Sequence, residues 1–199
     1  MTILPVTYLG SVEYFAHLLR EECVIDLGEH FIKRSERNRA QIMTANGILA
    51  LTVNVRNGNR PQTPVRDVRI DYSKRWQHLH RTALMSAYRS SPYFEHYAPS
   101  LMPFYERKFE FLADYNLQLT ELLLQLAHID RRPQISELYV EAADGDRDLR
   151  PKKRESRFDC PPYYQLFSER FPFAANLSFA DLLLAEGPSA ISVLRSCRL

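Results

Sequence analysis

The sequence has no apolar run long enough to cross a membrane. Its longest one, LLLQLA at residues 122–127, is far shorter than the roughly 20 residues that a bilayer requires. The amino-terminal stretch MTILPVTYLG also lacks the basic and long apolar segments of a secretory signal peptide. These absences predict a soluble, cytoplasmic protein.

Cysteine is scarce, with three residues at positions 23, 160 and 197. Their wide spacing and odd number match neither a disulfide framework nor a zinc site, which favours a reducing compartment and no metal. The patterns GxGxxG, GxxxxGK[ST] and GxSxG are absent as well, so the sequence assigns no cofactor. It does not indicate an oligomeric state.

An excess of one charge is also missing. The chain has 26 basic and 24 acidic residues, a formal net charge of +2. Nucleic-acid binding is therefore not favoured, because that function usually needs a broad basic surface. A site for an anion would have to come from local clustering.

The sequence does contain alternating strand-like and helical patterns. Runs at 3–6 and 23–27 are typical of strands, and residues 8–20 between them have one apolar helical face. In 40–55, two strand-like runs flank Asn46-Gly47, a dipeptide that supplies the positive φ angles of a tight hairpin turn.

Helical patterns dominate the second half of the chain, beginning with residues 74–89. The expected fold class is α/β: a single domain over 1–199, with a small mixed sheet, a central β-hairpin and a helix-rich carboxy-terminal half. Residues 144–157 have six basic and four acidic side chains and almost nothing apolar, which predicts an exposed charged loop.

The stretch FIKRSERNRA, residues 31–40, holds four basic side chains and one acid. If it is extended, Lys33, Arg37 and Arg39 share one face. Arginine offers a bidentate fork to phosphate or carboxylate and lysine adds a point charge, so this face could bind an anion. Spacing alone favours the alternative, a solvated edge strand whose charge discourages aggregation.

Histidine and tyrosine supply further candidates. His80 follows Trp76 on the apolar face of a helical pattern, where it could act as acid, base or donor beside a pocket. The pattern alone favours a half-buried, hydrogen-bonded histidine. Tyr93 lies in an aromatic stretch that could line a pocket or simply pack.

The amino-terminal strand, turn and helix pattern is LPVTYLGSVEYF, with Gly10 at the turn. Such a junction can present backbone N–H groups to an anion. The more ordinary interpretation is a plain connection between a strand and a helix.

Taken together, these segments resemble the WbqC-like protein family nearly end to end. The matching blocks are P-x-x-Y-L-G-x-x-x-Y-F from Pro5, F-x-K-x-x-x-x-N-R-x-x-I from Phe31, W-x-x-x-H from Trp76, A-Y-x-x-x-P-Y-F from Ala87, Y-x-Q-x-F from Tyr163 and N-L-S-x-x-D-L-L-x-x-x-G-P from Asn176. The chain departs from the family at Asn54, where L-T-[IV]-P-V usually has proline.

The resemblance implies a context of bacterial surface-polysaccharide (O-antigen-type) biosynthesis. The leading hypothesis is an enzyme, a transferase, that binds an anionic donor such as a nucleotide-sugar, acyl or aminoacyl phosphate and transfers a group to a sugar. The residues implied in anion or donor binding are Lys33, Asn38, Arg39, Tyr8, Gly10 and Trp76. The catalytic candidates are His80 as general base, with Tyr88 or Tyr93 orienting the acceptor.

The alternative hypothesis is a non-catalytic ligand-binding or scaffold protein of the same pathway. It predicts an anion site without a poised base, so the surroundings of His80 discriminate between the two. A third hypothesis, nucleic-acid binding, requires residues 147–157 and 33–39 to share a face.

Overall fold

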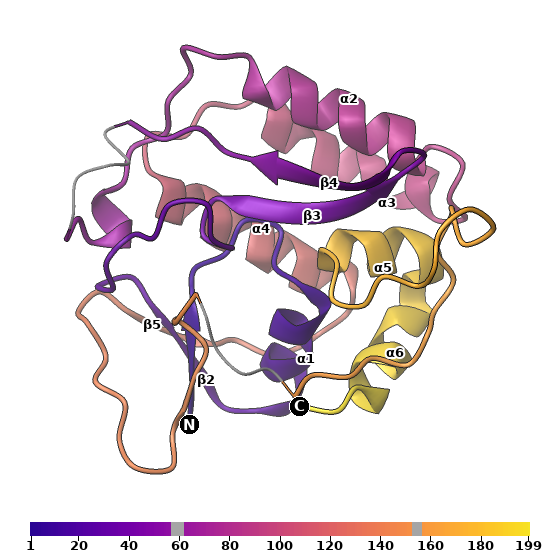
Figure 1. Ribbon diagram of the computed structural model, residues 1–199. Helices are drawn as coiled ribbons and strands as arrows, with labels where there is room; N and C mark the ends of the chain where they lie inside the picture. Colours follow the sequence, from indigo (N-terminus) through magenta and orange to yellow (C-terminus); the bar gives the residue numbers. More distant parts are fainter. Residues whose placement is uncertain (57–61, 153–156) are drawn as a thin grey trace.

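The computed structural model describes residues 1–56, 62–152 and 157–199 (Figure 1). Its main sheet has four parallel strands in the order β5-β2-β1-β6. The strands are β1 (Thr2–Pro5), β2 (Cys23–Asp26), β5 (Gln134–Ser136) and β6 (Arg147–Asp148). Every residue of β1 and β2 is buried, as expected for the centre of a parallel sheet.

The order of the strands creates a switch in chain direction beside β1. From β1 the chain passes through helix α1 (Val12–Arg20) to β2 on one side, and later reaches β5 beyond β2. It then returns to pair β6 with the opposite side of β1. Ligands of open α/β sheets bind outside the carboxyl ends of the strands at such a point.

The predicted hairpin is confirmed and forms a sheet of its own. Strands β3 (Arg39–Thr44) and β4 (Gly47–Thr52) pair antiparallel from Thr44↔Gly47 to Arg39↔Thr52. Of the Asn46-Gly47 pair only Gly47 has a positive φ, 96°. In Figure 1 the hairpin lies beside helix α2, which contacts β3.

The remaining helices confirm the α/β class. They are α2 (Trp76–Tyr88), α3 (Phe94–Leu101), α4 (Leu112–Leu126), α5 (Phe179–Glu186) and α6 (Ala190–Ser196), with short 3-10 turns η1 (Val65–Asp67), η2 (Met102–Tyr105) and η3 (Gly187–Ser189). Among the described residues, none of these helices combines the length and apolar character needed to cross a bilayer.

The basic stretch does not have the extended conformation considered for it. Residues 33–38 form turns, and β3 begins only at Arg39. Asn38 stabilises this turn, because its side chain accepts from the Arg34 N–H at 3.1 Å and donates to the Val53 carbonyl at 3.0 Å. Lys33, Arg37 and Arg39 therefore do not share a strand face.

The charged segment 144–157 is exposed at most of its described positions, but not at all of them. It contains β6, and Leu149 and Arg150 are only 8% and 5% exposed. Arg150 is buried because it bonds two carboxylates, which are Asp26 and Asp148. Residues 153–156 of this segment lie outside the described residues.

Candidate functional site

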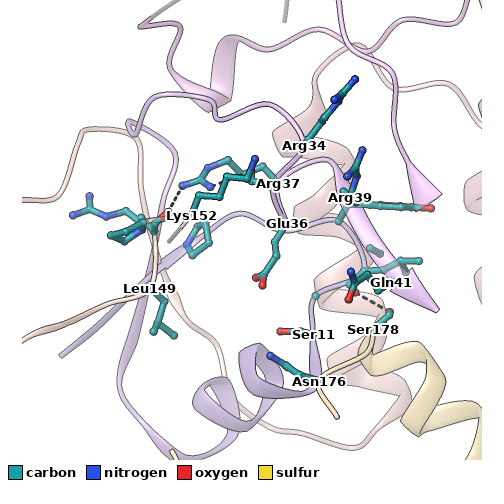
Figure 2. A pocket seen from close by; sticks show the side chains of 18 residues that line it. Ser11, Arg34, Glu36, Arg37, Arg39, Gln41, Leu149, Lys152, Asn176 and Ser178 are labelled. Carbon is teal, nitrogen blue, oxygen red and sulfur yellow. Dashed lines mark hydrogen bonds between the residues drawn. The ribbon is translucent and has the colours of Figure 1, made fainter. Parts of the chain in front are cut away.

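A cleft of about 280 Å³ opens at the carboxyl ends of β1 and β6 (Figure 2). Three segments far apart in the sequence form its walls: the β1–α1 connection, residues 149–152 after β6, and the 34–41 turn, a name that here includes the first residues of β3. Asn176 and Ser178, before α5, complete it. The cleft therefore lies where the sheet topology favours ligand binding.

The two helices that border the cleft are joined at their amino-terminal ends. Ser11 and Ser178, the N-cap residues of α1 and α5, face each other in an antiparallel bridge. The Val12 N–H donates to the Leu177 carbonyl at 2.9 Å, and the Phe179 N–H donates to the Gly10 carbonyl at 2.7 Å. These bonds consume donors of the first helical turns, so the helix ends themselves offer few free N–H groups.

The β1–α1 connection is tightly packed around Gly10. A Cβ there would meet Thr7 Oγ1 and the Tyr14 ring at 2.7 Å, so a larger residue does not fit without a shift. Within the described chain, the backbone N–H groups of Gly10 and Ser11 have no hydrogen-bond partner. Successive N–H groups in a turn can bind an anion, so anion binding at this junction stays a prediction.

Backbone strain gathers around the cleft. The described chain has five non-glycine residues with positive φ, and three of them line the cleft: Leu9 at 46°, Arg34 at 57° and Asn176 at 60°. Such conformations persist where the surrounding structure imposes them, and they cluster at functional sites.

The centre and the rim of the cleft differ in charge. Figure 2 shows the Glu36 carboxylate pointing into the cleft, whereas Arg34 and Arg39 extend along its upper rim. Arg39 Nε also donates to Thr52 Oγ1 at 3.0 Å. Lys152 contributes a third cation. The cleft thus holds one carboxylate and is bordered by positive charge.

Glu36 is held by its backbone. Its carbonyl accepts the Tyr8 N–H at 2.9 Å, which fastens the turn to the β1–α1 connection. The neighbouring Arg37 is only 2% exposed and is bound on several sides. The backbone position from which the Glu36 side chain extends is therefore fixed, as binding and catalytic sites require of the elements that carry them.

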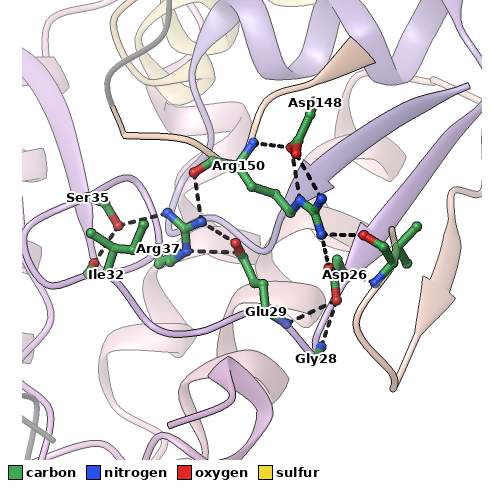
Figure 3. Close-up of polar contacts among 9 residues, drawn as sticks. Asp26, Gly28, Glu29, Ile32, Ser35, Arg37, Asp148 and Arg150 are labelled. Atoms are coloured by element: carbon green, nitrogen blue, oxygen red, sulfur yellow. Dashed lines mark hydrogen bonds and ion pairs between the residues drawn. The ribbon is translucent and has the colours of Figure 1, made fainter. Parts of the chain in front are cut away.

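A charged network lies behind this wall and consists of Asp26, Glu29, Arg37, Asp148 and Arg150 (Figure 3). Arg37 bonds both Glu29 oxygens, with Nε to Oε1 at 2.8 Å, and donates to the Arg150 carbonyl at 2.9 Å. Arg150 in turn bonds both Asp26 and Asp148. The network fixes the 34–41 turn to the end of β6.

Burial shapes the protonation of this network. Desolvation raises the pKa of Glu29 to about 7, against the opposing attraction of Arg37. Desolvation also acts on Asp148, but hydrogen bonds from Arg150 outweigh it and lower the pKa of that carboxyl. The chain therefore buries several ionisable groups only by pairing them.

An aromatic cluster, defined as Tyr8, Trp76, His80, Tyr105 and Tyr115, lies on the other side of Tyr8. Tyr8 Oη is 2.9 Å from His80 Nδ1 and 3.0 Å from Tyr105 Oη. Desolvation lowers the pKa of His80 to about 4, although a hydrogen bond with the Thr52 backbone opposes the shift. His80 is thus a neutral, packed histidine near pH 7.

The structure brings together only some of the predicted site residues. Tyr8, Gly10 and Arg39 line the cleft. Asn38 supports the turn beside it. Lys33 is absent from the lining, although its carbonyl is 3.5 Å from Lys152 Nζ.

The remaining predicted residues lie elsewhere. Trp76 and His80 belong to the aromatic cluster and do not line the cleft. Tyr88 donates to Asp181 at 2.7 Å within the core. Tyr93 packs against Gly187, where a Cβ would meet its ring at 2.6 Å. The predicted catalytic group of His80, Tyr88 and Tyr93 is therefore not assembled in the cleft.

Sequence reasoning missed Glu36, Ser11, Asn176 and Lys152 as cleft residues. Asn176 and Ser178 stand in the N-L-S block quoted above, which was the available signal. Glu36 had none, because one acid within a basic stretch usually indicates a solvated surface. Among the described residues, no group of three or more His, Cys, Asp or Glu side chains is arranged to hold a metal ion.

Comparison with known proteins gives one match. The model of the WbqC-like protein family matches residues 7–155, which include the turn before α1, helix α1 itself, the basic turn and β6. No curated protein and no solved structure matches the chain. Because the match covers most of the chain, including the cleft residues from Tyr8 to Lys152, the protein belongs to the WbqC-like protein family.

Proposed function

We propose that the cleft binds an anionic donor and a sugar acceptor, and that the protein transfers a group between them in bacterial surface-polysaccharide biosynthesis. The observation that carries the proposal is the Glu36 carboxylate in a cleft with a cationic rim at the switch point of the sheet. The donor is a nucleotide-sugar, an acyl phosphate or an aminoacyl phosphate.

Each part of the cleft supplies one part of this chemistry. Arg34, Arg39 and Lys152 offset the negative charge of a phosphate or carboxylate on the donor. Neutral groups such as Ser11 and Gln41 suit sugar hydroxyls, which both donate and accept hydrogen bonds. The polar lining and its modest volume fit a small polar ligand better than an apolar one.

Glu36 takes the role of general base that the sequence analysis gave to His80. As the acceptor hydroxyl forms its bond to the transferred group, the bond from that group to its carrier breaks, and Glu36 accepts the hydroxyl proton. His80 suits this role less well, because it is buried, neutral and engaged by Tyr8.

The test compares thermal shifts of the full chain with nucleotide-sugars, coenzyme A esters and adenylates. The Arg39→Ala variant should lose most of the shift given by the best ligand, whereas Arg89→Ala, an exposed arginine outside the cleft, should keep it. If the two variants bind equally well, the cleft is not the anion site.

Catalysis is tested with the ligand found in that screen. Glu36→Gln should retain donor binding and lose at least about 100-fold in transfer rate, the usual contribution of a general base. Glu95→Gln, an exposed glutamate on α3, should transfer at the wild-type rate. An unchanged rate in Glu36→Gln would remove this residue from the mechanism.

The second candidate is a non-catalytic ligand-binding protein, which the packed state of His80 favours. It predicts ligand binding that depends on Arg39 but no transfer by the wild-type protein with any donor and sugar tested. Binding and product formation measured on the same samples separate the two functions.

A further inference from the structure

Two of the three cysteines, which the sequence separates widely, face each other near the carboxy-terminus. Asp159 and Arg198 form an antiparallel bridge with reciprocal bonds, Asp159 N–H to the Arg198 carbonyl at 3.1 Å and Arg198 N–H to the Asp159 carbonyl at 2.8 Å. The next residues inward are Cys160 and Cys197, so the bridge places them opposite each other.

This position is the one that suits a disulfide. In an antiparallel pair, the residues beside a hydrogen-bonded pair have Cα atoms about 4.5 Å apart and side chains on the same face. Disulfides form at Cα separations of about 4.4–6.8 Å. Cys197 is extended, with φ −63° and ψ 144°, and Cys160 precedes Pro161, which favours the same conformation.

The two thiols already interact. A side-chain hydrogen bond links Cys160 to Cys197; it lowers the pKa of Cys197, and Arg20 acts in the same direction. The same contact and burial raise the pKa of Cys160. Cys197 is therefore the better nucleophile of the pair, since the thiolate is the reactive form.

We propose that Cys160 and Cys197 are a disulfide-forming pair that responds to a disulfide oxidant of the glutathione class. The Cys197 thiolate attacks one sulfur of glutathione disulfide, which forms a mixed disulfide and releases one glutathione thiolate. Cys160 then loses its proton and attacks the Cys197 sulfur, which forms the internal disulfide and releases a second glutathione. Two protein thiols are oxidised and one glutathione disulfide is reduced.

The position of the pair in the fold determines how an oxidant reaches the thiols and how a disulfide between them would change stability. Both residues are 3% exposed, but Cys197 is the C-cap residue of α6, a helix of only 7 residues. Fraying of this helix end exposes the pair at low free-energy cost. The disulfide would close a loop that includes α5 and α6, which stabilises the fold by constraining the unfolded chain.

The experiment incubates the full wild-type chain with glutathione disulfide, then counts free thiols after denaturation and maps the peptides by mass spectrometry. The expected result is one free thiol, at Cys23, and a peptide linking Cys160 to Cys197. The oxidised protein should also unfold several degrees higher than the reduced protein. Three remaining thiols, a link through Cys23 or a lower unfolding temperature would overturn the proposal.

Single variants test the order of attack. Cys160→Ser should stop at a glutathione adduct on Cys197, whereas Cys197→Ser should leave Cys160 unmodified under the same conditions. Cys23→Ser serves as the matched control, because Cys23 lies on β2 with its thiol near the His17 carbonyl, and it should form the disulfide as the wild type does. An adduct confined to Cys160 would contradict the proposed mechanism.

Discussion

The charged network and the aromatic cluster are both buried, polar and in contact with the cleft, yet they hold their groups by different means. The network pairs ions: Arg37 with Glu29, and Arg150 with Asp26 and Asp148. The cluster links neutral groups: Tyr8 bonds His80 and Tyr105. The two regions thus differ in what remains when one partner is removed.

Removing one ion leaves an opposite charge buried, whereas removing one neutral group leaves only an unpaired donor or acceptor. The first defect costs several kcal/mol and the second about 1–3 kcal/mol. The network holds the 34–41 turn, which carries Glu36 into the cleft. The geometry of this side of the cleft therefore depends on the region that is more sensitive to the loss of one partner.

The largest expected effect is that of Asp26→Ala. Asp26 is fully buried and accepts bonds from Arg150 and from the N–H groups of Gly28, Glu29 and Val140. Its loss should lower the free energy of unfolding by about 3–5 kcal/mol, because three N–H donors lose their acceptor and Arg150 loses one of its two carboxylate partners. Urea unfolding followed by circular dichroism measures the change.

The matched control is Asp67→Ala. Asp67 is 59% exposed and lies 4.0 Å from Arg66, so the free energy of unfolding should change by no more than about 0.5 kcal/mol. Equal losses in the two variants would mean that burial of the ion pair is not what makes the network sensitive.

The second largest expected effect is a difference between the two regions in how their contribution to stability depends on pH. The pKa of Glu29 rises from 4.5 to about 7 on folding. Its contribution to the free energy of unfolding is therefore fully present below pH 4.5 and is lost as pH rises toward 7. The pKa of His80 falls from 6.5 to about 4, so its contribution is present above pH 6.5 and is lost as pH falls toward 4. The two slopes oppose each other.

In the wild type the two opposing dependences of unfolding free energy on pH largely cancel, so variants that lack one group should show the dependence caused by the other. Between pH 4.5 and 6.5, Glu29→Gln should become more stable as pH rises, and His80→Phe should become less stable, each by about 1.4 kcal/mol per pH unit relative to the wild type. Urea titrations across this range measure the slopes. Parallel curves for the wild type and both variants would show that neither group changes protonation on folding.

Tyr8→Phe is expected to have the smallest effect of the three tests. It leaves His80 Nδ1 and Tyr105 Oη without their shared partner, which should cost about 1–2 kcal/mol of unfolding free energy. Tyr164→Phe, at a tyrosine 48% exposed, is the control and should be nearly neutral. A loss as large as that of Asp26→Ala would contradict the distinction between the regions.

Local patterns predicted the parts of the fold that local interactions determine. The hairpin followed from Asn46-Gly47 and the helix α1 from its apolar face, and both are present. The burial of Arg37 could not be predicted, because its partner Arg150 is 113 residues away in the chain. A basic stretch is usually solvated, and only the folded chain shows that one of its arginines is internal.

The candidate site was predictable to a similar extent. The family blocks indicated Tyr8, Gly10 and Arg39, which meet in the cleft. They also indicated His80, whose helical spacing is the same for a packed histidine and for a catalytic one. Spacing shows on which face of a helix a residue lies, but not which residues pack against that face. His80 packs against Tyr8, Trp76 and Tyr105.

The bond between Arg37 and the Arg150 carbonyl has a consequence for how the protein is made. The two residues are 113 positions apart, and contacts of such long range form slowly because a large loop must close first. During synthesis, the 34–41 turn emerges from the ribosome well before the β6 segment that fixes it. The cleft is therefore completed only after most of the chain has been translated, and a truncated chain would lack it.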